Sequence, residues 1–298
     1  MEEMVYQKYQ HIERYGTDEV NGIENGTCYV FPKIDGTNSQ LWWNDGLRAG
    51  SRNRELTLEA DNAGFYNWAV GRGEFGRFFE FHPNLRLYGE WLVPHTLRAY
   101  KDNAWRNFYV FDVVDENGAY LPYEQYKILL EEYGINFIPP LCRVYNPTYE
   151  RLIGLLEEND YLIKDGKGSG EGIVIKNYDW RNKYGRTTWA KIVKSEFKAA
   201  HRGKEARVVK EVSLVEERIV EKYVTLSLVE KEKAKIEGEV GEWSSRLIGR
   251  LLGVVFYCLV NEECWNFIKE FKMPTVDFKK LNYFCGMRVK YLMPELFL

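Results

Sequence analysis

Residues 31–38, with the sequence FPKIDGTN, constrain the fold of this chain more than any other stretch, because they place a lysine where a strand meets a turn. The preceding residues 27–31 are mainly β-branched or aromatic, which predicts a strand. The Asp-Gly pair predicts a tight turn, and a second apolar run follows at 41–43. We therefore expect Lys33 beside a tight connection between two paired strands.

The position of Lys33 matters because lysine acts as a nucleophile only when its amine is neutral. A free lysine has a pKa of about 10.4, so the ammonium form dominates at neutral pH and has no lone pair to donate. Desolvation or nearby cations favour the neutral amine, which can then attack a carbonyl or a phosphorus. The alternative is an ordinary surface lysine ahead of a hairpin turn, and the short string K-x-D-G does not separate the two.

Length and composition predict a soluble globular protein with two domains. The chain has 298 residues, of which 45% are hydrophobic and 29% charged, and domains usually hold about 100–200 residues. The net charge of -3 argues against a protein that coats nucleic acid indiscriminately, but it is compatible with a local basic groove. Aromatic residues make up 15% of the chain, which suits a β-rich core and offers rings that can stack on bases.

The cysteines and the terminus indicate a cytoplasmic protein. No C-x-x-C pair occurs among Cys28, Cys142, Cys258, Cys264 and Cys285, so disulfides and zinc sites are not expected. The first residues are acidic and lack the apolar core of a signal peptide. The longest apolar stretch, 247–260, contains Arg250 and is shorter than the roughly 20 residues that cross a bilayer. We expect no membrane association.

Two segments carry polar side chains that suit a nucleotide. Residues 47–56 contain three arginines, including Arg52 and Arg54, and the planar guanidinium group matches phosphate oxygens. A solvated polar loop is the alternative for this stretch. Glu90 lies near the end of a predicted strand between apolar residues. It either has a partner such as a ribose hydroxyl or a metal, or it lies in solvent on an edge strand.

Phe111 is the candidate for stacking on a base. It lies in the predicted strand 107–114, where regular alternation directs it to the side opposite Val110 and Asp112. A ring on the site-facing surface would stack against a purine. Packing in the core is the alternative.

The last candidate segments lie between residues 165 and 210. A glycine-rich loop without P-loop spacing leads to Glu171 and an apolar strand, and a glutamate at the start of a strand is well placed to hold Mg²⁺. Residues 187–194 alternate as a further strand. The region 181–210 holds ten Lys or Arg residues against two acidic ones, which indicates a polyanionic ligand, with a solvated charged face as the alternative.

The order of these segments resembles the six-part signature of the covalent nucleotidyltransferases, which include the ligases and the capping enzymes. The six segments, between residues 27 and about 198, are KIDG, SRNR, YGEW, FYVFDV, EGIVIK and WAKIVKSEF. Within this group the chain is most similar to the RNA ligase 2-like branch. In that branch a K-x-D/H-G-T-N motif, an F-Y-x-F-D strand and a small helical C-terminal domain occur together.

The resemblance implies an α+β fold with two domains. Residues 1–204 would form an antiparallel-sheet nucleotidyltransferase (adenylation) domain of the ATP-grasp-like ligase type, and residues 205–298 a small all-helical domain that binds RNA ends. The apolar period of residues 208–237 supports a helix. Residues 243–271 are expected to continue as one or two helices, followed by a tail from residue 273. Few alternating strands occur here, so the OB domain of DNA ligases and capping enzymes is not expected.

The resemblance also implies a role for each candidate residue. The expected catalytic residues are Lys33, Lys191 and Arg52. The expected nucleotide-binding residues are Asp35, Gly36, Asn38, Arg54, Glu90, Phe111, Glu171 and Lys194. Lys33 would carry AMP and Lys191 would contact its α-phosphate, while the two arginines would hold phosphate. Glu90 would accept a hydrogen bond from the ribose, Phe111 would stack on adenine, and Glu171 would hold Mg²⁺ or Mn²⁺ directly or through water.

One departure from the family pattern concerns the last strand. The family often carries K-x-K, with both lysines on one face, whereas here the pair is Lys191 and Lys194, with Val193 in the alternate position. An odd spacing puts Lys194 on the opposite face of a regular strand. Its contact with the α-phosphate would therefore need a bulge or a strand end.

The activity implied by the resemblance is that of an ATP-dependent RNA ligase. It would join an RNA 3′-hydroxyl to a 5′-phosphate through a covalent lysyl-AMP and an adenylated RNA 5′ end. Two alternatives stay open, a GTP-using transferase of the capping type and a non-catalytic RNA-binding descendant. Drift at Lys33 or Glu171 would be expected in a non-catalytic descendant, and both residues are present.

Overall fold

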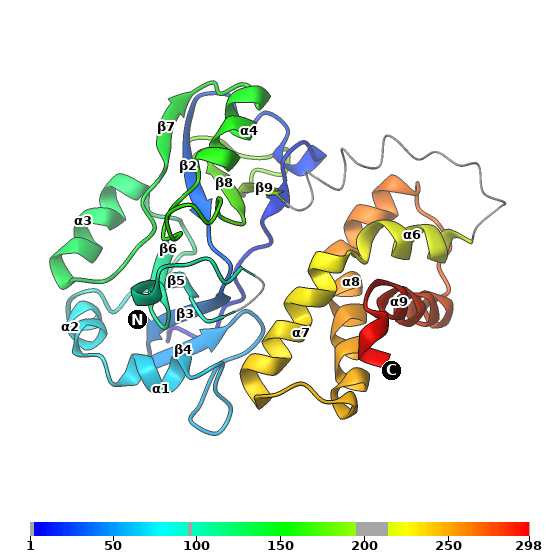
Figure 1. The fold of residues 1–298 in the computed structure, drawn as a ribbon. Coiled ribbons are helices and arrows are strands. Elements are labelled where there is room, and N and C mark those ends of the chain that lie inside the picture. The colour runs from blue at the N-terminus through cyan, green and yellow to red at the C-terminus, as the bar shows by residue number, and fades with distance from the viewer. Residues whose placement is uncertain (1–2, 95–96, 195–213, 298) are drawn as a thin grey trace. The chain divides into compact units, whose positions relative to one another are not determined.

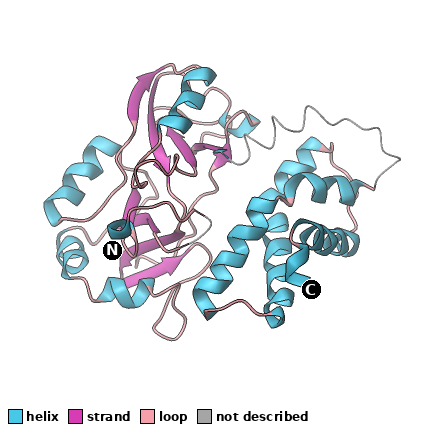
Figure 2. Ribbon diagram, viewed as in Figure 1, coloured by secondary structure: helices cyan, strands magenta, loops and turns pink. Residues whose placement is uncertain are grey.

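The computed structural model describes residues 3–94, 97–194 and 214–297 of the chain (Figure 1). The chain divides into two compact units, Met1–Ala199 and Ala200–Leu298. Figure 2 shows strands and helices in the first unit, and helices in the described part of the second. The predicted α+β fold with antiparallel sheets and a helical C-terminal region is confirmed. The predicted boundary between residues 204 and 205 lies outside the described residues.

Sheet A of the first unit has the strand order β1-β9-β8-β2-β7. Its strands are β1 (Glu13–Arg14), β2 (Thr27–Lys33), β7 (Cys142–Tyr145), β8 (Gly172–Lys176) and β9 (Ala190–Val193). Neighbouring strands are antiparallel except β1 and β9, which are parallel. Helix α4 (Tyr149–Glu158) covers one face of this sheet, where Leu152 and Leu155 share a buried cluster with Val30 and Ile175.

Sheet B has the strand order β4-β3-β5-β6 and is antiparallel throughout. Its strands are β3 (Thr37–Trp43), β4 (Leu47–Ser51), β5 (Leu85–Trp91) and β6 (Phe108–Asp115). Helices α1 (Phe65–Val70) and α2 (Gly73–Phe81) contribute apolar rings to one face of the sheet. There the Phe65 ring centroid lies 5.0 Å from that of Phe108 and 5.6 Å from that of Trp91.

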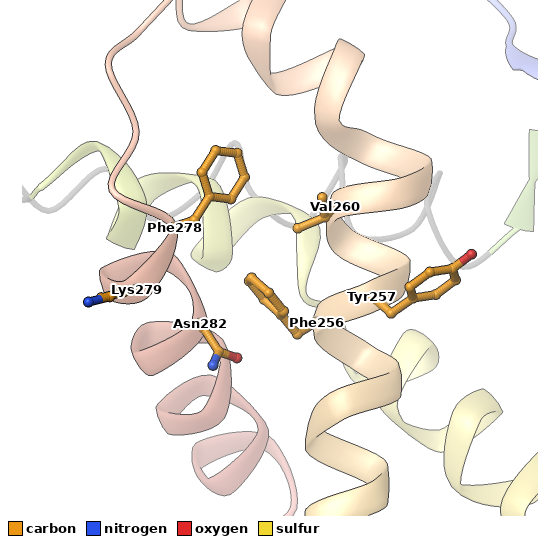
Figure 3. A pocket seen from close by; sticks show the side chains of 6 residues that line it. All are labelled: Phe256, Tyr257, Val260, Phe278, Lys279 and Asn282. Atoms are coloured by element: carbon orange, nitrogen blue, oxygen red, sulfur yellow. The ribbon is translucent and has the colours of Figure 1, made fainter.

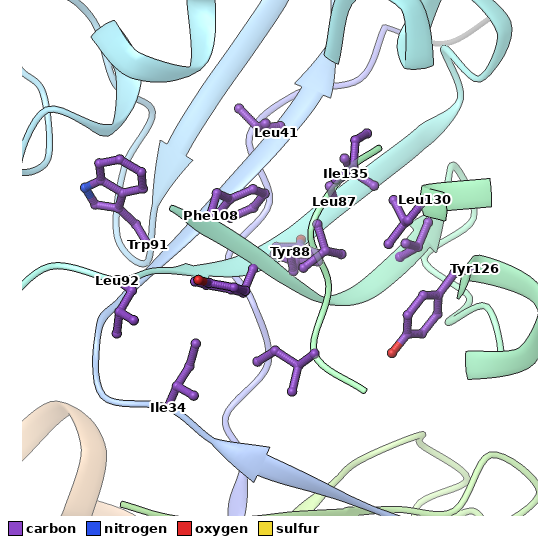
Figure 4. Close-up of a cluster of buried hydrophobic side chains, with 14 of the residues drawn as sticks. Ile34, Leu41, Leu87, Tyr88, Trp91, Leu92, Phe108, Tyr126, Leu130 and Ile135 are labelled. Carbon is purple, nitrogen blue, oxygen red and sulfur yellow. The ribbon is translucent and has the colours of Figure 1, made fainter. Parts of the chain in front are cut away.

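The main core of the first unit joins the strands of sheet B to the helices around them. Figure 4 shows Leu41 and Leu87 from the strands together with Tyr126 and Leu130 from α3 (Tyr123–Tyr133). Many of the buried members are aromatic, as the composition led us to expect. Two 3₁₀ turns, η1 (Asp18–Val20) and η2 (Asp102–Ala104), lie in the connections.

The predicted pairing of the strands on either side of Lys33 is wrong. β2 pairs with β7 and β8 in sheet A, whereas β3 pairs with β4 and β5 in sheet B. The turn between them bonds to remote partners instead of closing a hairpin. The Asp35 N–H donates to Tyr100 Oη at 2.7 Å. The Gly36 N–H donates to Glu90 Oε1 at 2.9 Å. Lys33 therefore lies where the chain passes from one sheet to the other.

The described part of the second unit, residues 214–297, consists of helices around one apolar core. The elements are α6 (Val215–Tyr223), α7 (Leu226–Val240), η3 (Ser245–Leu247), α8 (Ile248–Glu270), α9 (Phe278–Leu292) and η4 (Pro294–Phe297). The core contains Ile219, Val255 and Leu281, one each from α6, α8 and α9. In the described residues no single helix is long and apolar enough to span a membrane. Only α7 taken with η3 and α8, bent by 117° between them, meets those criteria as a pair.

Two sequence predictions for this unit are corrected by the structure. The predicted helix over 208–237 is interrupted at Thr225, whose side chain accepts a hydrogen bond from the Leu228 N–H and so begins a new helix, α7. The predicted C-terminal tail is wrong, because residues 278–292 form helix α9. The Asp277 side chain caps this helix by accepting from two backbone N–H groups.

Gly89→Ala is expected to lower the free energy of unfolding by about 1–3 kcal/mol. The added methyl group would lie 2.4 Å from the Phe108 ring and 2.6 Å from the Tyr109 carbonyl oxygen. Gly76→Ala in α2 is the matched control, because its methyl group would meet nothing within 4 Å, and alanine in a helix is favoured over glycine by about 0.5–1 kcal/mol. Urea unfolding followed by tryptophan fluorescence measures both. Equal stability of the two variants would contradict the close packing at Gly89.

Candidate active site

Lys33 and Glu171 form an ion pair at the junction between the sheets. Lys33 is the last residue of β2 and lies directly opposite Gly172 on β8. Its Nζ donates to Glu171 Oε2 at 2.6 Å. The two side chains are 21% and 19% exposed, so both groups stay within reach of a ligand from solvent. Residues 138 positions apart in the sequence are thus brought together, as the motif order predicts.

The register of sheet A decides which residues share the face that carries Lys33. Directly opposed residues in antiparallel strands point to the same face, and so do residues two apart within a strand. Phe31 lies opposite Val174, and Val174 lies opposite Lys191. Lys33 and Lys191 therefore project from the same face of the sheet, and Lys191 is partly exposed there.

Lys194, for which the resemblance implied a nucleotide contact, lies away from these two lysines. It follows the end of β9, and its Nζ donates to Ser169 Oγ at 2.6 Å and to Glu157 Oε2 at 2.8 Å. Glu157 belongs to α4, which covers the other face of sheet A. The structure thus does not bring the Lys194 ammonium together with Lys33 and Lys191.

Gly36 and Glu90 form a contact that no larger residue at position 36 would permit. Glu90 Oε1 accepts from the Gly36 N–H at 2.9 Å. A Cβ atom on Gly36 would lie 2.5 Å from the Trp91 carbonyl oxygen and 2.8 Å from Glu90 Cγ. The glycine in the motif therefore allows the carboxylate of β5 to hold the turn that follows Lys33.

Asp35 stabilises the same turn from inside the protein. It is buried, and its Oδ2 accepts from the Leu97 N–H at 3.0 Å. Its own N–H donates to the hydroxyl of Tyr100, whose burial raises its pKa well above the usual value. The Tyr100 hydroxyl therefore stays protonated at neutral pH. In the structure Asp35 fixes the backbone around Lys33.

Asn38 offers a polar atom that the protein itself does not satisfy. It lies directly opposite Glu90 in the β3–β5 ladder, so both side chains belong to one face of sheet B. Its Oδ1 is buried and has no hydrogen-bond partner in the part of the chain that the structure describes. A buried acceptor without a partner costs free energy unless a ligand donates to it. Asn38 and Glu90 together suit a ligand with hydroxyl groups.

Phe111 does not follow the alternation predicted for its strand. Asp112 lies opposite Tyr88 while Val110 lies opposite Gly89, so a β-bulge leaves Phe111 as the extra residue. The Phe111 ring centroid lies 5.0 Å from that of Tyr9 and 5.8 Å from Lys176 Nζ. Since Asp112 also contacts Lys176, the prediction that alternation separates Phe111 from Asp112 is wrong. The bulge brings both to the side that faces sheet A.

A buried ion pair between Lys176 and Asp112 lies beneath the site and was not among the predicted site residues. Lys176 Nζ donates to Asp112 Oδ1 at 2.8 Å and to the Phe111 carbonyl oxygen at 2.6 Å. Asp112 Oδ2 also accepts from the Tyr9 hydroxyl and from Trp189 Nε1. Burial lowers the pKa of Lys176, while Asp112 opposes that shift. The signal in the sequence was a charged residue within each of two apolar strands, Asp112 and Lys176.

The two candidate arginines lie in different surroundings. Arg52 follows β4, and its carbonyl oxygen accepts from the Tyr6 hydroxyl at 2.7 Å. The preceding Ser51 lies opposite Ser39, next to Asn38 in β3. Arg54 instead turns its guanidinium group back onto the loop that follows, where it donates to the carbonyl oxygens of Ala60 and Asp61. The predicted phosphate contact of Arg54 is therefore not supported.

The residues present fit a magnesium-type ion bound mainly by its substrate. In the described ranges no group of three or more His, Cys, Asp and Glu side chains forms a metal site. Mg²⁺ commonly keeps several waters and binds one or two carboxylates together with substrate phosphates. The partly exposed carboxylate of Glu171 meets that requirement.

Comparison with known proteins places the chain in a family. A family model described as RNA ligase matches residues 26–193, which is more than half of the sequence. The chain belongs to the RNA ligase family. A comparison with curated protein sequences gave no significant match.

Solved structures of Naegleria gruberi RNA ligase share the fold of this RNA ligase family member. A lysine-to-methionine mutant with AMP and Mn aligns with a TM-score of 0.51 at 20% identity. The same ligase with PPi aligns at 0.50 and 21%, and a lysine-to-alanine mutant with ATP and Mn at 0.50 and 20%. Each match covers 66% of this chain and 58% of the Naegleria chain. At this level of identity the likeness establishes the fold.

Lys176→Met is expected to lower the free energy of unfolding by about 3–5 kcal/mol, because it leaves the buried carboxylate of Asp112 without its cation. Lys194→Met is the matched control. It breaks an ion pair with Glu157, whose side chain is 69% exposed, and such pairs contribute about 0–1 kcal/mol. Chemical unfolding of both variants measures the difference. If Lys176→Met lowered the free energy of unfolding no more than Lys194→Met does, the buried pair would not have the structural role expected of it.

Proposed function

We propose that this protein is an ATP-dependent RNA ligase that joins RNA 3′-hydroxyl and 5′-phosphate ends. The observation that carries the proposal is the ion pair between Lys33 Nζ and Glu171 Oε2 at 2.6 Å, in a member of the RNA ligase family. Lys191 shares the face of sheet A with Lys33, which gives a second cation for a phosphate. RNA ends are the proposed partners, and the cytoplasm is the proposed compartment.

The first proposed step is the transfer of AMP to Lys33. The neutral amine attacks the α-phosphorus of ATP, so that a P–N bond forms while the bond to pyrophosphate breaks in line. Lys33 is the cation of an ion pair in the structure, so its ammonium has to give up a proton before it attacks. The Glu171 carboxylate that accepts its hydrogen bond is placed to receive that proton. A Mg²⁺ or Mn²⁺ ion bound at Glu171 would supply positive charge that offsets the phosphate oxygens. Lys191 would offset the charge that gathers on the α-phosphate.

The nucleotide would lie between the inward faces of the two sheets. Glu90 would accept from a ribose hydroxyl, and the buried Oδ1 of Asn38 would accept from a second donor of the ligand. Phe111, held at its bulge, would stack on adenine, and Arg52 would hold phosphate. Arg54 and Lys194 are left out because their side chains bind elsewhere in the protein.

The later proposed steps use the same site. The 5′-phosphate oxygen of RNA attacks the phosphorus of lysyl-AMP, which breaks the P–N bond and returns the Lys33 amine. The 3′-hydroxyl of the second RNA end then attacks the adenylated 5′-phosphate, and AMP leaves as the phosphodiester forms. Dividing ligation into in-line transfers lets one arrangement of cations serve each step.

Incubation of the protein with Mg²⁺ and α-labelled ATP is expected to attach the label covalently, so that the label stays on the protein during denaturing electrophoresis. Lys33→Ala should abolish the label, because it removes the attacking amine. Lys164→Ala is the matched control, since that lysine pairs with the exposed side chain of Asp102. Label that persists in Lys33→Ala, or no label in the unmodified protein, would disprove the proposal. Label from GTP alone would indicate a capping-type transferase.

Lys191→Ala is expected to slow label formation by about 100-fold to 1000-fold, because it removes a cation from the transition state of phosphoryl transfer. Lys194→Ala should leave the rate within about threefold, since its ammonium binds Glu157 and Ser169. Single-turnover rates with saturating ATP measure both. The reverse order of the two rates would place the α-phosphate on the other face of β9.

A further inference from the structure

Helix α9 carries a concentration of positive charge that the proposed chemistry at Lys33 does not use. Its 15 residues contain no Asp or Glu. Its four cationic residues are Lys279, Lys280, Arg288 and Lys290. The chain as a whole has a net charge of -3, so a helix whose charged residues are all positive forms a local basic surface.

The helix turns this charge and several rings away from the core. Leu281, Cys285 and Val289 are four residues apart and are buried in the core of the second unit. The arc of the helix opposite these three residues faces outward. Lys279, Lys280 and Lys290 are exposed there. Tyr283 and Tyr291 are 63% and 74% exposed.

A hollow of about 400 Å³ lies beside the first turn of α9 (Figure 3). The residues that line it are Phe256, Tyr257, Val260, Phe278, Lys279 and Asn282. Tyr257 and Phe278 are each about half exposed. The hollow therefore combines aromatic surface with one ammonium and one carboxamide, which can both donate and accept.

We propose that this outer face of α9 and the adjoining hollow bind a single-stranded segment of RNA. Lys279, Lys280 and Lys290 contact phosphates, and unpaired bases stack on Tyr283 and Tyr291. Lys279 and Lys290 lie about 16 Å apart along the helix axis, so they meet different phosphates of one strand. A further base enters the hollow beside Phe278. This inference rests on the proposed function only in taking RNA as the ligand.

The chemistry of the face favours single-stranded RNA over other ligands. A duplex hides the faces of its bases, so exposed rings would add nothing to its binding. A membrane-bound helix needs a free apolar face, whereas the apolar side of α9 is already buried in the core. The centre of a protein interface is usually depleted in lysine.

The test is fluorescence anisotropy with the full-length protein and a labelled, unstructured RNA of about twelve nucleotides, without ATP and in EDTA. Tyr283→Leu and Tyr291→Leu keep apolar volume but remove the stacking ring. Each is expected to raise Kd about fivefold or more, since stacking contributes about 1–3 kcal/mol per base. Trp265→Leu is the control, because it removes a half-exposed ring from α8 that does not line the hollow.

The lysines give a second, independent measurement. Lys279→Gln combined with Lys290→Gln is expected to reduce the slope of log Kd against log salt concentration by about 1.4, because each phosphate contact contributes about 0.7 for a single strand. Arg246→Gln removes an exposed charge before α8 and should leave the slope unchanged. Thermal unfolding at the wild-type midpoint confirms that each variant is folded.

Four results would overturn the inference. The α9 variants could bind RNA with the wild-type Kd, or the wild-type protein could bind a duplex of the same length as tightly as the single strand. Sedimentation could show a dimer that Tyr283→Leu dissociates, or the protein could bind phosphatidylserine vesicles instead of RNA in a way that depends on α9. ATP labelling of the wild-type protein without RNA tests the proposed function alone. Absent label with α9-dependent RNA binding would disprove the ligase and keep the RNA site, whereas label with α9-independent RNA binding would do the reverse.

Discussion

The buried ion pair between Lys176 and Asp112 links the two sheets of the first unit inside an apolar core to which both sheets contribute. Strands β8 and β6 belong to separate hydrogen-bond ladders, so no backbone bonds between them hold the sheets in place. Burying two charges is costly unless further hydrogen bonds satisfy them. Tyr9, Trp189 and the carbonyl oxygen of Phe111 supply those bonds. The same contacts hold the bulge and the Phe111 ring that belong to the proposed nucleotide site.

Those parts of the site that depend on local periodicity were predictable from the sequence. Alternation along β9 put Lys191 and Lys194 on different faces, and the contact of Lys194 with α4 supports that placement over the nucleotide contact that the resemblance implied for it. The order of the motifs indicated that Lys33 and Glu171 lie close together, and in the structure they form an ion pair. The hairpin after Lys33 was not correctly predicted, because turn residues there bond to Tyr100 and Glu90, which are remote in sequence. The bulge at Phe111 has no signal in the sequence, since it is fixed by partners on other strands.

Helix α9 of the second unit had a recognisable pattern in the sequence, although the segment was predicted to be a tail. Asp277 is a favourable cap, and Leu281, Cys285 and Val289 recur every fourth residue, which predicts an amphipathic helix. The polar and aromatic residues between them, and Pro274 before them, gave the segment the appearance of a tail. The features that hid the helix are the ones that make its outer face basic and aromatic. The Lys, Arg and Tyr residues of this segment therefore made helix α9 hard to predict, but they do indicate the chemistry of its exposed face.

The contact of Glu90 with the turn after Lys33 bears on the sugar contact that we propose for this carboxylate. This carboxylate holds the backbone of Gly36, three residues after Lys33, and the absence of a side chain at Gly36 lets it approach closely. In the proposed complex, a sugar hydroxyl that donates to this carboxylate would share it with the turn. Recognition of the sugar and alignment of the proposed attacking amine would then be coupled through one side chain, so a nucleotide without that hydroxyl would lose reactivity as well as affinity.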